Sequence, residues 1–389
     1  MRLLVLDQFS ELGGAQMCLA DVLREARGRG WEAEVMAPGH GPLLDFAREC
    51  GFRALSLPVA GYATSRKAAL DGIQFGFGMV RSARAVRQAL RDHPADLIYV
   101  NGPRILPLAA GAGAPVLFHA HSILTSRVVR AIAAWCLRRS HASVVACSEF
   151  AAGPLRAVLG AERVRVIYNG VADHLRLRAP RRGPLRVGLV GRIAPEKGHL
   201  EFLQAARLLA GRSDVRFVIA GAALFSDRAY ERAIRSLGAN LGVEFLDWTP
   251  DVAELLSGLD ILALPSAAWD ASPRVVLEAF SAGVCVAAYP SGGLPELIRH
   301  GHTGALTAQR HPLELVRTIQ RLADDGALRS RLAAGARREW EARFTVARFQ
   351  REVCDRIEAE AAAPALAASA AHSKSEAPAL GRDATHARR

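Results

Sequence analysis

Short apolar runs alternate with amphipathic stretches along most of the chain, and this alternation limits the fold more than any other feature. Arg2–Leu6 and Asp96–Val100 are two of the apolar runs, and Gln16–Arg27 is an amphipathic stretch with helical spacing. Near-continuous apolar strands joined by helices are typical of a parallel sheet that is covered on both faces. The pattern predicts an α/β protein built on doubly wound, Rossmann-like sheets, with ligands at the carboxyl ends of the strands.

The alternation pauses over residues 175–184, where prolines and arginines break the periodicity. We interpret this segment as a linker between an N-terminal domain, residues 1–174, and a C-terminal domain that starts at residue 185. Two such domains are expected to face each other across a cleft. Residues 361–389 are rich in alanine and contain no aromatic side chain, so they are predicted to be a disordered tail.

The charge balance points to an anionic partner. Fifty basic and 38 acidic side chains give the 389 residues a formal charge of +12, which favours nucleic acid, a membrane surface or a phosphorylated substrate. Aromatic residues make up only 6% of the chain and no RNA-binding module is visible, so a nucleic-acid partner is not expected. The longest charge-free stretch, residues 105–126, contains prolines and histidines and is interpreted as a buried strand with its loops.

The N-terminus and the cysteines favour a reduced compartment. Four apolar residues precede Asp7, whereas a secretory signal needs about 7–15. The six cysteines are scattered and form no Cys-x-x-Cys pair, so neither a disulfide framework nor a zinc site is expected. These features predict a cytoplasmic protein without a metal cofactor.

A glycine-bounded turn carries two cations after the first strand of the second half. The strand Leu185–Val190 is followed by Gly191-Arg-Ile-Ala-Pro-Glu-Lys-Gly198, and a helix is predicted to begin at His199. A helix N-terminus carries about half a positive charge, to which Arg192 and Lys197 each add a full one. This turn is suited to clamping a diphosphate, although as an isolated motif it also fits a surface turn with two solvated cations.

Two further loops of the second half also follow predicted strands. After Ile261–Leu264, Asp270 lies in a loop and Glu278 lies eight positions later, in a predicted helix. Carboxylates accept hydrogen bonds from the paired hydroxyls of a sugar or a ribose. A third loop, residues 289–296, contains the run Gly-Gly-Leu-Pro-Glu. Three such loops at successive strand ends favour one shared site over three unrelated turns.

Taken together, residues 185–305 resemble the retaining GT-B glycosyltransferases of family 4, also called glycosyl transferases group 1. The resemblance rests on the turn at 191–198, the run Phe-Leu-Asp-Trp-Thr-Pro at 245–250, Pro-Ser at 265–266, and Gly-Gly-x-Pro-Glu at 292–296. Its strongest element is a pair of carboxylates eight positions apart, present here as Asp270 and Glu278. The resemblance implies a GT-B fold, in which the C-terminal domain (185–340) binds a nucleotide-sugar and a helix over 341–360 returns to the N-terminal domain.

The resemblance also implies a role for each matching residue. Arg192 and Lys197 would bind the donor diphosphate, and Glu278 the ribose hydroxyls. Asp270 would hold the transferred sugar, backbone amides at Arg274 and Val275 would contact phosphate, and Trp248 and Thr249 would border the base. Asp270 departs from the glutamate that is usual in the family, which retracts the carboxylate by about 1.5 Å, so either the loop compensates or the sugar preference differs.

Two features of the first half complete the candidate site. Gly13 and Gly14 precede a predicted helix and resemble the family's glycine loop, which faces the donor across the cleft; a plain helix-start loop fits equally well. His121 follows the strand Pro115–Ala120 and matches the family's strand-end histidine that lines the sugar pocket, although a histidine at a strand end also fits a structural role. Because no third ligand accompanies His119 and His121, a metal site there is rejected. The expected catalytic residues are His121, Asp270, Arg192 and Lys197.

Arginines in the first half suggest where the acceptor comes from. Arg81, Arg84, Arg87 and Arg91 form one stripe on a predicted helix, and four more arginines lie within Arg127–Arg139. If the acceptor is lipid-linked, such faces would bring the enzyme to an anionic membrane. The alternative is a helix that packs on the sheet with a solvated arginine face, and the acceptor is then a saccharide or a lipid-linked molecule.

The expected reaction moves a sugar from a nucleotide-diphosphate donor to a hydroxyl acceptor with retained configuration, in surface glycan or glycolipid synthesis. The alternatives are a sugar-nucleotide epimerase or hydrolase of the same fold and a non-catalytic sugar-nucleotide-binding protein.

Overall fold

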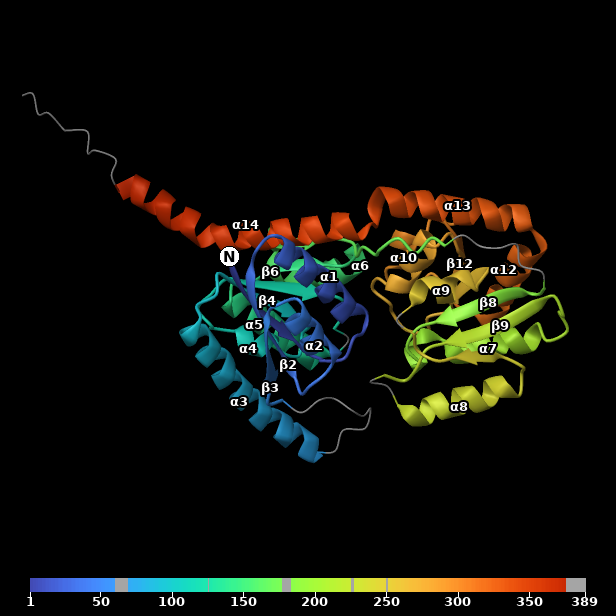
Figure 1. The fold of residues 1–389 in the computed structure, drawn as a ribbon, viewed down its shortest axis with the longest axis horizontal. Helices are drawn as coiled ribbons and strands as arrows, with labels where there is room; N and C mark the ends of the chain where they lie inside the picture. Colours follow the sequence, from blue (N-terminus) through green and yellow to red (C-terminus); the bar gives the residue numbers. More distant parts are fainter. Residues whose placement is uncertain (60–68, 125, 177–182, 225–226, 250, 376–389) are drawn as a thin grey trace, which may run out of the picture.

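The computed structural model describes the chain apart from residues 60–68, 125, 177–182, 225–226, 250 and 376–389. The described residues form two α/β domains that lie side by side, each built on one parallel sheet with helices on both faces (Figure 1). The two-domain, doubly wound architecture predicted from the apolar runs is confirmed.

The first sheet has the strand order β3-β2-β1-β4-β5-β6-β7 within the described residues, and its pairings are parallel. Its strands are β1 (Arg2–Asp7), β2 (Glu32–Pro38), β3 (Arg53–Leu57), β4 (Leu97–Asn101), β5 (Val116–Ala120), β6 (Ser143–Ala146) and β7 (Val164–Val166). Its helices are α1 (Gly14–Gly28), α2 (Pro42–Glu49), α3 (Ala69–Asp92), α4 (Leu106–Ala109), α5 (Arg127–Arg139) and α6 (Glu149–Leu159), with a 3₁₀ turn, η1 (Ala161–Arg163).

The second sheet has the order β10-β9-β8-β11-β12-β13 in the described part of the chain, again with parallel pairings. Its strands are β8 (Leu185–Val190), β9 (Val215–Ala220), β10 (Glu244–Leu246), β11 (Ile261–Leu264), β12 (Cys285–Ala288) and β13 (Ala305–Leu306). The remaining helices are η2 (Pro195–Lys197), α7 (His199–Leu208), α8 (Arg228–Ala239), α9 (Val252–Ser257), α10 (Arg274–Ser281), α11 (Leu294–Leu297), α12 (Pro312–Asp324), α13 (Gly326–Arg343) and α14 (Val346–Ser375).

Both sheets reverse their strand order near the middle, and these two points determine where ligands can bind. The reversal lies between β1 and β4 in the first sheet and between β8 and β11 in the second. Loops that leave a parallel sheet on opposite sides of such a point open a crevice at the carboxyl ends of the strands. The turn at 191–198 follows β8 and the loop with Asp270 follows β11, so the topology places them on either side of one crevice.

The chain crosses between the domains twice, and the two crossings are hydrogen-bonded to each other. Val171 donates its N–H to the carbonyl of Phe344 at 3.0 Å, and Val346 donates to the carbonyl of Val171 at 2.9 Å. Gly170 is required at this crossing because a Cβ atom there would lie 2.4 Å from the backbone oxygen of Thr345. The two crossings are therefore paired to each other where they leave the domains.

The bounds predicted for the C-terminal helix, residues 341–360, are wrong, because this pairing interrupts the helix near its start. Residues 341–343 still belong to α13, whose Trp340 packs in the C-terminal core, and α14 begins only at Val346. Thr345 separates the two helices because its backbone forms a bridge with Val171. The apolar side of α14 joins the core of the first domain through Phe349 and neighbouring residues, so this helix lies along that domain (Figure 1).

The prediction of a disordered tail from residue 361 is wrong for residues 361–375, which continue α14. Alanine has the most favourable helix propensity, and the eight alanines of residues 361–375 extend a helix that is already nucleated on the first domain. The remainder of the predicted tail, residues 376–389, lies outside the described residues. None of the helices, over the described residues, combines the length and apolarity that crossing a membrane requires.

Candidate active site

The turn after β8 brings its two cations to the crevice of the second domain. Gly198 has φ +77°, and a Cβ atom there would lie 1.8 Å from the carbonyl oxygen of Pro265, so only glycine allows the turn to pack against the loop after β11. The guanidinium of Arg192 pairs with Glu196 within the turn. Lys197 ends the short η2 helix just before α7, so its ammonium group lies near the positive end of a helix dipole.

Lys197 links the two loops that flank the crevice. Its Nζ donates to Oδ2 of Asp270 at 2.5 Å, and both side chains are largely shielded from solvent. A carboxylate and an ammonium at this distance hold each other in place, and an anionic ligand that reaches Lys197 is therefore next to Asp270. The structure brings together two residues that the sequence places 73 positions apart.

The Gly-Gly turn after β12 supports the loop that carries Asp270. Gly292 has φ +59°, and a Cβ atom there would lie 2.2 Å from the carbonyl oxygen of Asp270. Gly293 donates its N–H to that same oxygen at 2.9 Å. The two glycines therefore allow a close contact between two backbone segments, and this contact positions Asp270.

Arg274, at the start of α10, ties the second domain to the first. Its guanidinium donates to Oδ2 of Asp21 on α1 at 3.0 Å and to the carbonyl of Gly170 at 3.2 Å, and only 10% of the side chain is exposed. Glu278 lies one turn further along α10, with Oε1 3.6 Å from Nε of Arg274. These carboxylates neutralise the buried guanidinium, so Arg274 is an interdomain anchor in addition to the donor-binding position expected from sequence.

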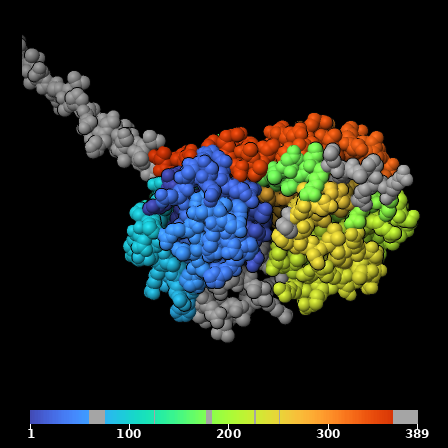
Figure 2. Space-filling model, viewed as in Figure 1, coloured from blue at the N-terminus to red at the C-terminus, as the bar shows by residue number. Residues whose placement is uncertain are grey.

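The glycine loop of the first domain meets α10 at this point. A Cβ atom on Gly14, the first residue of α1, would lie 4.0 Å from Cδ of Arg274. Gly13 precedes it as the helix N-cap. The start of α1 therefore lies beside the start of α10 in the second domain. Figure 2 shows the two domains as separate bodies that touch along a seam.

His121 lies at the carboxyl end of β5 in a chain of hydrogen bonds that sequence reasoning missed. Its Nε2 is 2.8 Å from Oδ1 of Asn101, whose Nδ2 donates to Oδ2 of Asp7 at 2.5 Å. Burial lowers the pKa of His121 to about 3, with the charge of Arg274 as a second cause, and burial raises the pKa of Asp7 to about 6. At neutral pH the imidazole is therefore neutral and the carboxyl group is ionised. The available signal was that Asp7 and Asn101 are polar residues ending two apolar strands.

His119 has a structural environment. It is buried in β5, contacts the hydroxyl group of Tyr99 through Nδ1, and burial keeps its pKa well below the usual range. Its ring lies 3.9 Å from that of His121 between centroids. No group of three or more potential metal ligands occurs among the described residues.

The remaining predicted donor-binding residues are Val275, Trp248 and Thr249, which lie in α10 and in the loop after β10. Val275 follows Arg274 in the first turn of α10, where the backbone N–H groups of a helix start are found. Trp248 is half exposed after β10, and Thr249 accepts a hydrogen bond from the N–H of Asp251 through Oγ1 at 3.1 Å. Trp248 and Thr249 lie in the loop after β10. This loop is separate from the loops after β8 and β11, which Lys197 and Asp270 join through their side chains.

Glu296 forms a second interdomain contact that the sequence did not reveal. Its carboxylate accepts hydrogen bonds from the N–H groups of Glu149 and Phe150, both at 2.7 Å, and from the hydroxyl group of Tyr168 at 3.0 Å. These two N–H groups open α6, where an α-helix offers them no partner of its own. A carboxylate from the second domain thus caps a helix of the first and interacts favourably with its dipole.

Removing this cap is expected to destabilise the protein. The Glu296→Ala variant loses three hydrogen bonds to a charged acceptor, which we expect to cost about 1–2 kcal/mol and to lower Tm by several degrees. Thermal unfolding followed by circular dichroism measures the change. Glu352→Ala is the matched control, since this exposed carboxylate pairs with Arg348 one turn away and should cost less than about 0.5 kcal/mol. Equal shifts for the two variants would contradict the capping role.

Family models match both domains of the chain. The family described as glycosyl transferases group 1 matches residues 178–339, and the one described as glycosyltransferase family 4 matches residues 12–174. The structure is similar to that of Anabaena HepE in complex with UDP and glucose, with a TM-score of 0.77 and 25% identity over 92% of this chain and 99% of that one.

Curated relatives match over shorter stretches. The 2-deoxystreptamine glucosyltransferase of Streptomyces kanamyceticus is 34% identical over 55% of this chain, and glycogen synthase of Mycobacterium tuberculosis is 32% identical over 56%. The matched stretches span 59% and 54% of those relatives' own lengths. Together, the two family matches and the fold place the chain among the GT-B glycosyltransferases, in group 1 of the glycosyl transferases.

Proposed function

We propose that the protein transfers a sugar from a nucleotide-diphosphate donor to a hydroxyl acceptor with retention of the anomeric configuration. The contact between Lys197 and Asp270 carries this proposal, because a cation suited to a diphosphate lies directly beside a carboxylate suited to sugar hydroxyl groups. Glu278, one turn into α10, is the second carboxylate of the same site and suits the vicinal hydroxyls of a ribose. The UDP and glucose bound to HepE support a UDP-hexose donor.

The reaction needs no protein nucleophile. The bond between the anomeric carbon and the donor phosphate oxygen breaks, while the acceptor oxygen bonds to the anomeric carbon on the same face and its proton passes to the departing phosphate oxygen. Arg192, Lys197 and the start of α7 would neutralise the charge that develops on the diphosphate, so we propose that no metal ion is required. Asp270 and His121 would orient the sugar from opposite domains.

A panel of donors and acceptors tests this function. UDP-, GDP- and ADP-sugars are incubated with soluble saccharides, alkyl glycosides and lipid-linked saccharides, and the products are identified by mass spectrometry and NMR. We expect an acceptor product whose mass has increased by one sugar and whose anomeric configuration matches that of the donor. An altered sugar nucleotide, free sugar as the sole product, or binding without turnover would instead support an epimerase, a hydrolase or a non-catalytic binding protein.

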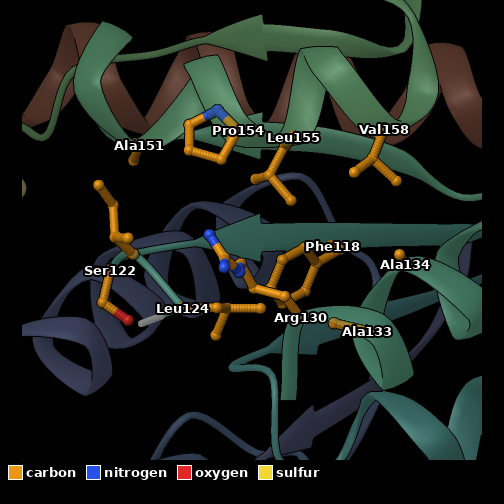
Figure 3. A pocket seen from close by; sticks show the side chains of 11 residues that line it. Phe118, Ser122, Leu124, Arg130, Ala133, Ala134, Ala151, Pro154, Leu155 and Val158 are labelled. Atoms are coloured by element: carbon orange, nitrogen blue, oxygen red, sulfur yellow. The ribbon is translucent and has the colours of Figure 1, made fainter. Parts of the chain in front are cut away.

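An apolar pocket lies beside the carboxyl end of β5. Phe118 and Leu124 line it on one side and Leu155 and Val158 of α6 on the other, with Arg130 of α5 among the lining side chains (Figure 3). Ser122, next to His121, also borders the pocket. An acceptor whose hydroxyl group lies at His121 could place an apolar portion here, so we propose an acceptor with such a portion, consistent with a glycolipid or a lipid-linked glycan of bacterial surface synthesis.

The outer face of α5 is suited to an anionic membrane. Val128, Ile132 and Trp135 recur at i, i+4 and i+7 and are 68%, 48% and 61% exposed. Four arginines flank them and the helix contains no acidic residue. On α3, which carries the first arginine stripe, Val86 is buried in the core, although Phe77 and Val80 are exposed. We therefore propose that α5, more than α3, rests on the inner face of the membrane, and the six buried free thiols fit a cytoplasmic location.

Vesicle binding tests this surface. The protein is expected to co-sediment with vesicles that contain anionic phospholipid and not with purely zwitterionic vesicles, because both apolar burial and arginine charge contribute. Exchanging Ile132 and Trp135 for serine should lower the bound fraction at least about fivefold, since each side chain buries apolar area in the interface. Leu237→Ser, at a similarly exposed leucine of α8 in the second domain, is the control. Binding that persists in the double variant would contradict the proposed surface.

A further inference from the structure

Three polar side chains at the ends of adjacent strands form a continuous hydrogen-bonded chain toward His121. Asp7 ends β1 and Asn101 ends β4, and the two residues are direct partners in the register of these strands. His121 follows β5, the next strand of the sheet. Asp7 and Asn101 are both fully buried, so their polar groups are satisfied by one another and by protein partners.

The amide of Asn101 has only one orientation that satisfies its neighbours. Its Nδ2 lies 2.5 Å from Oδ2 of Asp7 and 3.3 Å from the carbonyl oxygen of Ala15, and both of these atoms are acceptors. Turning the amide over would place Oδ1 against a carboxylate and a carbonyl group, which is electrostatically unfavourable. Oδ1 must therefore face His121.

Asp7 is itself held in place. Its Oδ1 accepts hydrogen bonds from Nε2 of Gln16 on α1 and from the N–H of Phe9, both at 2.8 Å. Gln16 is also buried. The carboxylate can therefore not rotate away from Asn101 without leaving a buried donor unpaired, which is costly.

This arrangement determines which nitrogen of His121 carries the proton. Because Oδ1 of Asn101 is an acceptor 2.8 Å from Nε2, that nitrogen must be the donor. The ring is neutral at neutral pH because burial lowers its pKa, so Nδ1 keeps its lone pair. No hydrogen bond to Nδ1 is found within the described residues, which leaves it as an acceptor for a hydroxyl group.

We propose that Asp7 and Asn101 are positioning residues that hold His121 in the Nε2-protonated tautomer and present Nδ1 as the acceptor for a substrate hydroxyl group. The role at the substrate rests on the proposed function, whereas the tautomer itself does not. A hydroxyl group that donates to Nδ1 is oriented with its own oxygen available, which suits either the transferred sugar or the attacking acceptor.

Asp7→Asn is the sharpest test because it preserves shape and replaces the carboxylate that fixes Asn101 with an amide. In this variant the side chain at position 7 can donate, so Asn101 can turn over and accept from it. Its own Nδ2 then points at His121, which requires Nδ1 to carry the proton instead. We expect nitrogen-15 NMR of histidine-labelled protein at pH 7.5 to show protonated Nε2 for His121 in the unaltered chain and protonated Nδ1, or a mixture, in Asp7→Asn. The His121→Gln variant assigns the signals among the twelve histidines.

A second variant and a control keep the test decisive if Asp7→Asn folds poorly. Asn101→Ser removes the connecting amide, so the preference for protonated Nε2 should weaken. Asp96→Asn is the control. Asp96 directly precedes β4, at the end of the strand opposite to Asn101, and accepts a hydrogen bond from the N–H of Arg2 at 2.7 Å. This variant should leave the His121 signals unchanged. Unaltered signals in both Asp7→Asn and Asn101→Ser would overturn the proposal, whatever the activity.

Kinetics separate this role from mere support of the fold. With a donor and acceptor that prove active, Asp7→Asn should lower kcat about 10–100-fold while the donor KM changes less than about threefold, because a misdirected hydroxyl group affects the reacting geometry more than donor binding. A parallel loss of thermal stability and donor affinity without a change in kcat would indicate a structural role only. A tautomer change in a protein that shows no transfer would leave the tautomer assignment standing and remove the proposed function together with the role at the substrate.

Discussion

Replacing Lys197 with alanine is expected to lower kcat by about 10²–10³, because the variant loses a full positive charge beside the departing diphosphate. In the structure Nζ of Lys197 also donates to Oδ2 of Asp270 at 2.5 Å, so alanine leaves this carboxylate without its cation. The measurement is the rate of nucleoside diphosphate release with the active donor and acceptor. Donor affinity should fall as well, since the lost charge contributes in the ground state.

Two companion variants make the result interpretable. Arg207→Ala removes a cation from the exposed side of α7, the helix that follows the turn, and should keep nearly full activity. Lys197→Arg keeps the charge but replaces a compact ammonium with a planar fork, so it should recover only part of the rate. A Lys197→Ala enzyme within about threefold of the unaltered kcat would contradict the assigned role.

Glu278→Gln is expected to raise the donor KM about 10–100-fold while kcat falls less. The neutral amide loses two charge-assisted acceptors for ribose hydroxyl groups, and hydrogen bonds to a charged group contribute about 1.5–3 kcal/mol. Because the ribose is bound equally in the ground and transition states, most of the loss should appear in KM. Initial rates over a range of donor concentrations give both constants.

The control for Glu278 is another glutamate of the second domain. Glu254, on α9, is largely exposed and pairs with Arg176, so Glu254→Gln should leave the donor KM unchanged. The Arg274 side chain retains its contacts to Asp21 and Gly170 in Glu278→Gln, which limits any effect on domain contact. An unchanged donor KM in Glu278→Gln would show that this carboxylate does not bind the donor.

The local features of the site could be predicted from the sequence because they lie in short segments. Arg192 and Lys197 lie between a strand and a helix that both have clear apolar patterns, and strand order then places their turn at the crevice. The glycines at 292–293 were recognisable as a turn, but their purpose was not, since it depends on a contact with the backbone of Asp270. Strand β13, with two residues, is too short for any periodicity to reveal.

Long-range contacts could not be predicted in this way. Arg274 was expected near phosphate through its backbone, yet its side chain reaches Asp21, 253 positions away. Glu296 belongs to a recognisable run, but its partners are backbone N–H groups in the other domain. Both contacts form only where the two domains meet. A sequence pattern within one segment predicts local structure and does not predict which distant residues it will contact.

The C-terminal segment shows how tertiary pairing outweighs local propensity. Residues from Trp340 onward are compatible with one continuous helix, but Thr345 pairs with Val171 and divides it into α13 and α14. Beyond residue 360, the alanine-rich composition predicts disorder, although alanine also favours helix once a helix is anchored. Composition alone did not distinguish these outcomes.

Calorimetric titration of nucleoside diphosphates tests the central claim most directly, namely that the crevice between β8 and β11 holds a donor diphosphate. UDP, GDP and ADP are titrated into the unaltered protein and into the Lys197→Ala and Arg207→Ala variants. We predict that at least one nucleotide binds with one molecule per chain, that Lys197→Ala weakens this binding at least about tenfold by loss of the charge, and that Arg207→Ala does not. Failure of all three nucleotides to bind, or equal binding to Lys197→Ala and the unaltered protein, would contradict the account.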